Sequence, residues 1–280
     1  MAVTITKADG TTEPFKVEKL RRSLRRAGAT PAEVNEIVAE VRTTLYDGIP
    51  TQEIYRHAFH LLHESEEVVA ASRYSLRRAL FGLGPTGFPF ETFLARLFAS
   101  TGYTTKTGLM IEGRCATHEI DLAAYTETHS FVAEAKFHSR PGIKSDLQVA
   151  MYSYARLLDL RDSRICNEDH CGITEFWLIT NTKFTSSAEA YARCVDIKLL
   201  SWNYPRGNNL HDLIQRSGLY PVTVLSDLSN AQRATLIERG AIVCRDLLEH
   251  EHLLRHLHLT KQRHEAVVAE ADRLCGSAVR

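Results

Sequence analysis

The segment from Ser130 to Lys136, with the sequence SFVAEAK, most constrains how this chain can fold. Its centre, Val132-Ala-Glu-Ala, is mostly apolar and is typical of a strand buried on both faces. Glu134 lies within this stretch and Lys136 just after it, and the two point the same way because residues i and i+2 of a strand share a face. Burying charge is costly. The segment therefore predicts a strand in a sheet that is covered on both faces. It also predicts that the charged groups at the end of this strand have a functional role.

Strands alternate with helices on either side of this segment. A helix opens near Phe90, and its inner face carries Phe93, Leu94, Leu97 and Phe98. The expected strands are 117–125, 130–135, 174–180 and 196–202, and the expected helices between them are 145–158 and 187–192. This alternation predicts an α/β layer.

The parts before and after this layer are expected to be mainly helical. A hairpin with an Asp9-Gly10 turn precedes helices at about 17–27, 31–45, 51–62 and 66–81, the second opened by the capping residue Thr30. The Gly- and Pro-rich stretch 82–89 marks a boundary. The expected domains are 1–84, 90–207 and a helical C-terminal region 208–280, which is loosely similar to a helix–hairpin–helix around Arg239.

Composition excludes several classes of protein. The 280 residues contain 34 Lys and Arg against 34 Asp and Glu, so an anion site must come from a local cluster rather than from overall charge. With 44% hydrophobic and 24% charged residues, wholesale disorder is excluded. No run suits a membrane span or a secretory signal, and six scattered Cys are expected to be reduced thiols. A cytoplasmic location is therefore expected.

Asp121, in the strand before Glu134, is the third member of a candidate catalytic set that also contains Glu134 and Lys136. A hairpin partner would bring Asp121 beside Glu134 and Lys136. The two carboxylates are hard oxygen ligands suited to Mg²⁺ or Mn²⁺, and Lys136 would position or deprotonate water, or stabilise negative charge. The alternative is a surface ion pair between Glu134 and Lys136, with Asp121 capping a turn.

Over about 90–204 this order resembles the PD-(D/E)xK nuclease superfamily, and most of all its Mrr-like restriction endonuclease branch. The resemblance implies a restriction-endonuclease-like α/β/α core, with Glu91 on the first helix, Asp121 on the second strand and Glu134-Ala-Lys136 on the third. Gln148 and Tyr152 resemble the Q-x-x-x-Y element of RecB-like members and share one helical face. Ile120 stands where the superfamily name has Pro, as an apolar residue commonly does in Mrr-like members.

The first 84 residues resemble the ATP-cone domain, a nucleotide-sensing module of ribonucleotide reductases. The matching elements include Lys7-Ala-Asp-Gly10, Ile49-Pro-Thr51 and Ala71-x-x-Tyr74. The resemblance implies that Lys7 and Lys19 hold phosphates. The positions implied to line the nucleotide are Val3, Lys7, Glu13, Phe15, Lys16, Lys19, Leu20 and Thr51. The basic run up to Arg26 has two other interpretations: a solvated helix face, or a contact with DNA backbone.

Two further clusters are weak candidates for metal ligands. Cys166, His170 and Cys171 match no common zinc module, so a surface loop is expected there. The His-rich stretch 250–258 is expected to be a solvated helix. Lys183, in the loop after strand 174–180, is a candidate phosphate contact.

These patterns together predict a metal-dependent endonuclease that hydrolyses DNA phosphodiester bonds and is regulated by ATP or dATP. The alternative is a nucleotide-sensing DNA-binding regulator whose nuclease fold is inactive. A homodimer is expected, because cutting a duplex needs two sites. The sequence does not decide whether the substrate is DNA or RNA, or whether the regulatory nucleotide is ATP or dATP. It also leaves open whether the nucleotide activates or inhibits.

Overall fold

The computed structural model describes residues 3–64, 68–166 and 172–276. The N-terminal part begins with a small sheet of β1 (Thr4–Thr6), β2 (Thr12–Pro14) and β3 (Ile49–Pro50), in which β1 pairs antiparallel with β2 and parallel with β3. Four helices pack beside it: α1 (Val17–Ala27), α2 (Pro31–Thr43), α3 (Thr51–Glu64) and α4 (Val68–Phe81). The Thr30 hydroxyl accepts from the Glu33 amide (3.3 Å), and the Glu33 carboxylate accepts from the Thr30 amide (2.8 Å), which fixes the start of α2.

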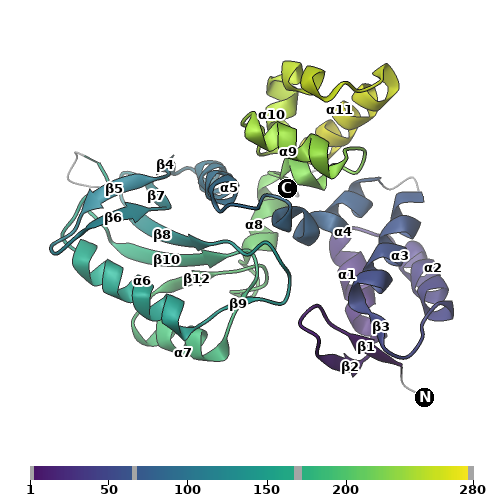
Figure 1. The fold of residues 1–280 in the computed structure, drawn as a ribbon, viewed down its shortest axis with the longest axis horizontal. Helices are drawn as coiled ribbons and strands as arrows, with labels where there is room; N and C mark the ends of the chain where they lie inside the picture. Colours follow the sequence, from purple (N-terminus) through teal and green to yellow (C-terminus); the bar gives the residue numbers. More distant parts are fainter. Residues whose placement is uncertain (1–2, 65–67, 167–171, 277–280) are drawn as a thin grey trace.

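The middle part of the chain forms a mixed five-stranded sheet, called the central sheet below, which lies on the left of the view in Figure 1. Its order is β12-β10-β8-β7-β4, with β8, β10 and β12 parallel and with β7 and β4 joined by antiparallel pairing. The bounds are β4 (Thr104–Lys106), β7 (Leu122–Tyr125), β8 (Ser130–Lys136), β10 (Glu175–Thr180) and β12 (Lys198–Leu200). Two short ladders lie beside it: β5 (Leu109–Glu112) with β6 (Thr117–Ile120), and β9 (Lys144–Ser145) with β11 (Lys183–Phe184).

Helices cover both faces of this sheet. Alternate residues of β8 enter two hydrophobic clusters: Phe131 and Ala133 pack with α5 (Phe88–Ala99), whereas Val132 packs with α6 (Leu147–Leu160) and α7 (Ser186–Cys194). The predicted α/β layer is therefore present, with Glu134 and Lys136 on the α6 face, since they continue the alternation of Val132.

Short helices make up the C-terminal part, which packs on the α5 side. They are α8 (Leu210–Ser217), η2 (Val222–Val224), α9 (Asn230–Glu238), α10 (Cys244–Glu249), η3 (Glu251–Leu257) and α11 (Lys261–Gly276). These elements agree with the helical character predicted for the C-terminal region. Its likeness to a helix–hairpin–helix stays a prediction.

Helix α4 is shared by two hydrophobic cores. Its first half places Ala70 and Ala71 in the core of the N-terminal part. Its second half places Leu76, Leu80 and the following Leu83 in the large core that also holds α5 and the C-terminal helices. The N-terminal part is therefore fixed against the rest of the chain by a continuous helix, although the sequence places a boundary just after it.

Asp246 is the polar link between α5 and the C-terminal helices. It is buried, accepts hydrogen bonds from the amides of Ile242 (2.8 Å) and Val243 (3.0 Å), and forms an ion pair with Arg96 of α5.

The substitution Asp246→Ala would leave these buried donors without a partner. We expect it to lower the free energy of unfolding by about 2–4 kcal/mol in urea titrations, whereas Asp272→Ala, at an exposed carboxylate of α11, changes it little. A loss below about 0.5 kcal/mol for Asp246→Ala would contradict this role.

Candidate functional site

The candidate catalytic residues meet where a predicted strand is interrupted. The segment 117–125 is divided into β6 and β7 by a bend at Asp121. In the β7–β8 register Leu122 faces Ala133, which brings Asp121 opposite Glu134. The Asp121 Oδ2 accepts a hydrogen bond of 2.7 Å from the Ala135 amide. The bend therefore frees Asp121 from the ladder and turns its carboxylate toward the end of β8.

Glu134 is held by a buried arginine that the sequence did not single out. Arg156 of α6 is 7% exposed, forms an ion pair with Glu134 and donates to the carbonyl of Glu119. Its Nε is buried and has no hydrogen-bond partner among the described residues. Lys136, two residues beyond Glu134, is exposed, and within the described part of the chain it forms no ion pair. One cation at this strand end is thus engaged and the other is available.

Glu91 reaches the same strand ends from the opposite layer. It lies in the first turn of α5, and a Cβ added at Gly87 would come within 3.1 Å of its Oε1. Burial first, and then the negative charges of Asp121, Glu119 and Glu134, together raise the pKa of Glu91 to about 7. Three of the six candidate catalytic residues, Asp121, Glu134 and Glu91, are therefore carboxylates close enough to affect one another. We call these three residues the acidic group.

The other two candidates lie on α6. Gln148 and Tyr152 are both exposed, and the Arg156 guanidinium lies 5.6 Å from the centre of the Tyr152 ring. Tyr152 thus lies beside Glu134's ion-pair partner, Arg156. Gln148 lies one turn further toward the start of α6 and faces solvent, where it is accessible to a ligand.

The acidic group is compatible with one divalent cation. Burial raises the pKa values of Asp121 and Glu134, and the Asp121 charge adds to the rise at Glu134, so negative charge is in excess. Across residues 3–64, 68–166 and 172–276, no group of three or more His, Cys, Asp or Glu side chains is placed to hold a metal. Mg²⁺ commonly keeps several waters and needs only one or two protein carboxylates, which Asp121 and Glu134 can supply.

A second group of candidate residues lies in the β1–β2 hairpin and α1. Glu13 forms ion pairs with Lys7 (3.0 Å) and Lys19 (2.5 Å), and the hydrogen bonds from Lys19 and then Lys7 lower the pKa of Glu13 to about 2. One carboxylate therefore holds both lysines that the resemblance assigns to phosphate. An anion bound here would meet two cations already placed together.

The remaining residues of this predicted nucleotide site are distributed differently. Thr51 lines the same hollow as Lys7 and Lys19. Leu20 is buried in the N-terminal core, against which Val3 and Phe15 also pack, and Lys16 is exposed just before α1. The structure thus brings together four polar members of the set but not Lys16, and the apolar members pack in or against the N-terminal core.

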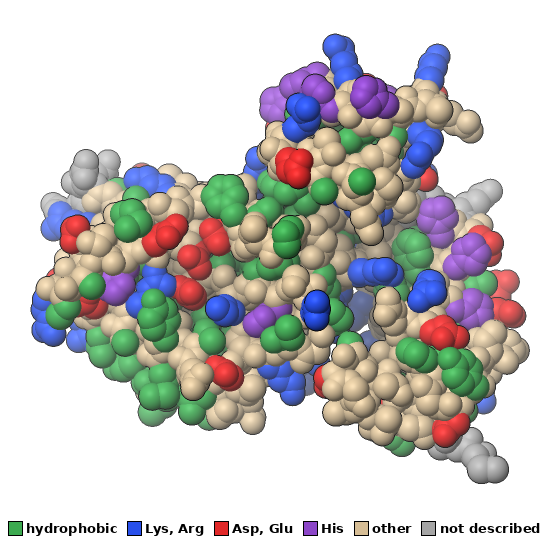
Figure 2. Space-filling model, viewed as in Figure 1, with side chains coloured by type: hydrophobic (Ala, Val, Ile, Leu, Met, Phe, Trp, Pro, Cys, Tyr) green, Lys and Arg blue, Asp and Glu red, His purple; other side chains and the backbone are tan. Residues whose placement is uncertain are grey.

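A cleft of about 1100 Å³ separates this hairpin from the central sheet. Figure 2 shows Lys and Arg side chains on both sides of the hollow between the two parts. The N-terminal wall includes Lys7, Lys19 and Arg77, and the opposite wall includes Lys144 and Lys183. Among these, the sequence had indicated Lys183 as a phosphate contact but not its neighbour Lys144.

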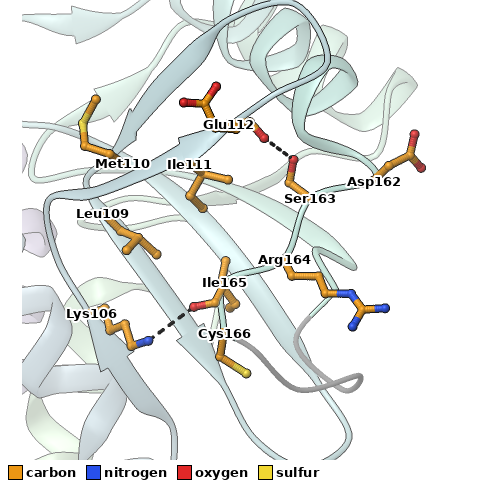
Figure 3. Close-up of a pocket in the computed structure, with 10 residues that line it drawn as sticks. All are labelled: Lys106, Leu109, Met110, Ile111, Glu112, Asp162, Ser163, Arg164, Ile165 and Cys166. Carbon is orange, nitrogen blue, oxygen red and sulfur yellow. Dashed lines mark hydrogen bonds between the residues drawn. The ribbon is translucent and has the colours of Figure 1, made fainter.

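Another cavity, of about 710 Å³, lies between β5 and the segment 162–166 (Figure 3). Lys106 donates to the Ile165 carbonyl (3.4 Å), and Ser163 donates to the Glu112 carbonyl (2.7 Å). Cys166, at its edge, is disulfide-bonded, so the expectation that all six thiols are reduced is wrong for this residue. His170 and Cys171 lie outside the described residues. The cavity brings together no set of catalytic side chains.

Comparison with known proteins defines the class and then the family. The ATP cone domain model matches residues 3–80, which confirms that part of the prediction, and the AF1548-like C-terminal model matches residues 220–275. An "Uncharacterized protein" from Archaeoglobus fulgidus is 38% identical over 184 residues, 65% of this chain and 100% of the relative. The chain is thus an ATP-cone protein, and it belongs to the AF1548-like family.

A solved structure agrees with this assignment. It is described as "Crystal Structure of Protein of Unknown Function AF1548", and it is 35% identical with a TM-score of 0.54. The match covers 68% of this chain and 99% of that chain. These matches do not address the nuclease resemblance, which stays a prediction.

Within the described residues, no helix is both long and apolar enough to cross a membrane.

The raised pKa of Glu91 leads to a test in metal-free protein. Its rise from 4.5 to about 7 means that the folded state holds this proton more tightly, so stability falls as the pH increases through that interval. We expect Glu91→Gln, in EDTA, to be more stable than the wild type at pH 8 by about 1 kcal/mol, discounted for solvent screening, and similar at pH 4. Urea unfolding at the two pH values measures this. Equal stability of the variant and the wild type at both pH values would show that burial and the neighbouring carboxylates do not raise the pKa of Glu91.

Proposed function

We propose that this protein is a metal-dependent DNA endonuclease whose activity responds to an adenine nucleotide bound by the ATP-cone. The convergence of Asp121, Glu134 and Lys136 at one end of the β7–β8 pair supports the nuclease part. The placement of Glu91 beside them adds support, because it matches the order of acidic residues in Mrr-like nucleases. The α/β/α arrangement around the sheet is also the one this resemblance implies.

Each residue has a role that follows from its position. Asp121 is oriented by the Ala135 amide, and Glu134 by Arg156, so both carboxylates are fixed before any ligand arrives. A Mg²⁺ or Mn²⁺ ion held by them would activate water and offset charge on the phosphoryl group. Lys136, exposed and without an ion-pair partner in the described chain, is free to hold the attacking water or to stabilise negative charge. Gln148 and Tyr152 would contact the DNA strand from α6.

A second function is favoured by one specific contact. Arg156 already neutralises Glu134, and a buried pair of this kind satisfies the carboxylate without a metal. In that case the chain would be a nucleotide-sensing regulator that binds DNA through an inactive nuclease fold. Calorimetric titration with Mn²⁺ separates the two functions, since the regulator would bind no ion at Asp121 and Glu134.

Nucleotide sensing has a direct route to the candidate catalytic strand. Gly142, with φ of +93°, lies against the hairpin turn, and an added Cβ would come within 3.2 Å of the Asp9 amide nitrogen. The loop that contains Gly142 follows directly after Lys136 and the end of β8. A nucleotide that moved the hairpin would therefore press on the segment that carries the candidate site, and it shifts the balance only between states that it binds unequally.

Substitution in the acidic group tests the nuclease proposal. We expect Asp121→Ala and Lys136→Ala each to lower Mg²⁺-dependent cleavage of supercoiled plasmid at least about 100-fold, because both act on the reacting groups. Glu127→Ala is the matched control, since it changes an exposed carboxylate at the other end of the same hairpin. Thermal unfolding shows that the variants are folded. Undiminished cutting by either variant, or no cutting of DNA by the wild type, would refute the assignment.

Nucleotide binding has its own test. We expect the full-length protein to bind ATP or dATP in calorimetry, and Lys7→Ala to weaken the affinity about 10-fold or more, the usual effect of losing one charge-assisted contact to phosphate. Arg42→Ala, at an exposed position of α2, should bind as the wild type does. Absence of binding to either nucleotide would leave the ATP-cone as a scaffold.

A further inference from the structure

The cleft between the ATP-cone and the central sheet carries positive charge that the protein does not balance internally. Of its described lining residues, nine are Lys or Arg and two, Asp9 and Glu13, are acidic. Glu13 is already shared by Lys7 and Lys19. The chain as a whole is neutral, so this excess is a local feature that the fold creates. Such a concentration of like charge costs free energy unless an anion enters.

The excess of positive charge is clearest on the wall of the cleft that belongs to the central sheet's side. Lys144 of β9 and Lys183 of β11 are direct partners in the parallel ladder, so two like charges lie beside each other. Like charges on adjacent strand positions are destabilising. Neither lysine forms an ion pair with a described residue. The ladder therefore places two available cations at the edge of the cleft.

The N-terminal wall adds an unsatisfied donor. Arg77 of α4 lines the cleft, and its Nε is buried with no hydrogen-bond partner among the described residues. A buried donor of this kind is unfavourable unless a ligand satisfies it. Burial lowers the pKa of Lys183, and the positive charges of Arg77, Lys144, Lys19 and Lys7 lower it further, which shows that cations from both walls interact.

We propose that Lys144 and Lys183, with Arg77, form a second phosphate site that holds the polyphosphate of the nucleotide bound by the ATP-cone. The inference rests on the proposed nucleotide binding and extends it, because two of the five phosphate contacts, Lys144 and Lys183, lie outside the ATP-cone. The ligand is a nucleoside di- or triphosphate that contacts Lys7 and Lys19 on one wall and the two lysines on the other. Binding would thus hold the two parts together.

The shape of the site favours a nucleotide over a nucleic-acid duplex. Small-molecule pockets commonly have volumes of about 300–1000 Å³, close to the size of this cleft. A duplex carries one charge per about 1.7 Å along its axis and is bound by an open stripe of cations. Here the cations face one another across a hollow, and the hairpin turn meets the Gly142 loop at its edge.

The test is calorimetry on the full-length protein with ATP and with adenosine, which lacks phosphate. We expect Lys144→Ala/Lys183→Ala to weaken ATP binding at least about 10-fold and to leave adenosine binding unchanged. Lys198→Ala is the matched control, since this lysine of β12 pairs with Asp196 and does not line the cleft. Thermal unfolding checks the fold. If the double variant does not fold, Lys183→Gln alone should weaken ATP binding about 3-fold or more.

The outcomes separate this inference from the function on which it rests. Unchanged ATP affinity in the folded double variant, with ATP bound by the wild type, overturns the second phosphate site and leaves the ATP-cone site standing. A double variant that keeps its ATP affinity but binds a labelled duplex less tightly shows that the lysines serve DNA, which also overturns the inference. A wild type that binds neither ATP nor dATP overturns both.

Discussion

The burial of α4 in two hydrophobic cores is the interaction on which the rest of the structure depends. Ala70 and Ala71 belong to the ATP-cone, whereas Leu76 and Leu80 belong to the core shared with α5 and the C-terminal helices. A helix packed at both ends cannot swing freely, so the ATP-cone keeps one position against the sheet. That position closes the cationic cleft and brings the hairpin turn to the Gly142 loop. The nucleotide site proposed for the ATP-cone and the residues at the end of β8 are thereby parts of one packed unit.

The acidic group at the end of β8 is the other unusual feature. Asp121, Glu134 and Glu91 all have raised pKa values, so their environment disfavours their charged forms and would be relieved by a cation. Arg156 relieves it in part by its ion pair with Glu134. Because Arg156 also donates to the Glu119 carbonyl, it links α6 to β6, the strand that ends just before Asp121. In the function proposed above, the balance between this internal cation and an external one would decide whether the protein acts as a nuclease or as a DNA-binding regulator.

Local signals in the sequence predicted much of the fold. The capping box at Thr30, the Asp9-Gly10 turn and the apolar spacing of α1 depend on neighbouring residues, and each is found where expected. The two-residue strand β3 was missed, because it is defined by its pairing with β1, more than forty residues away. The break at Asp121 was missed for a similar reason: a strand pattern runs through it, and only the bond to Ala135 shows the change of direction. Arg156 resembles any arginine of an amphipathic helix until Glu134 is placed beside it. The domain limits, and the likeness to restriction endonucleases, stay predictions.

The central claim is that nucleotide bound at the ATP-cone alters chemistry at the acidic group. Its most direct test is the initial rate of Mg²⁺-dependent plasmid cleavage measured across an ATP titration, beside the calorimetric binding curve of the same preparation. We expect the rate to change, in either direction, with a midpoint equal to the dissociation constant of ATP, because one binding event would cause both signals. A rate that stays constant while ATP saturates the protein, or the absence of cleavage at every ATP concentration, would contradict it.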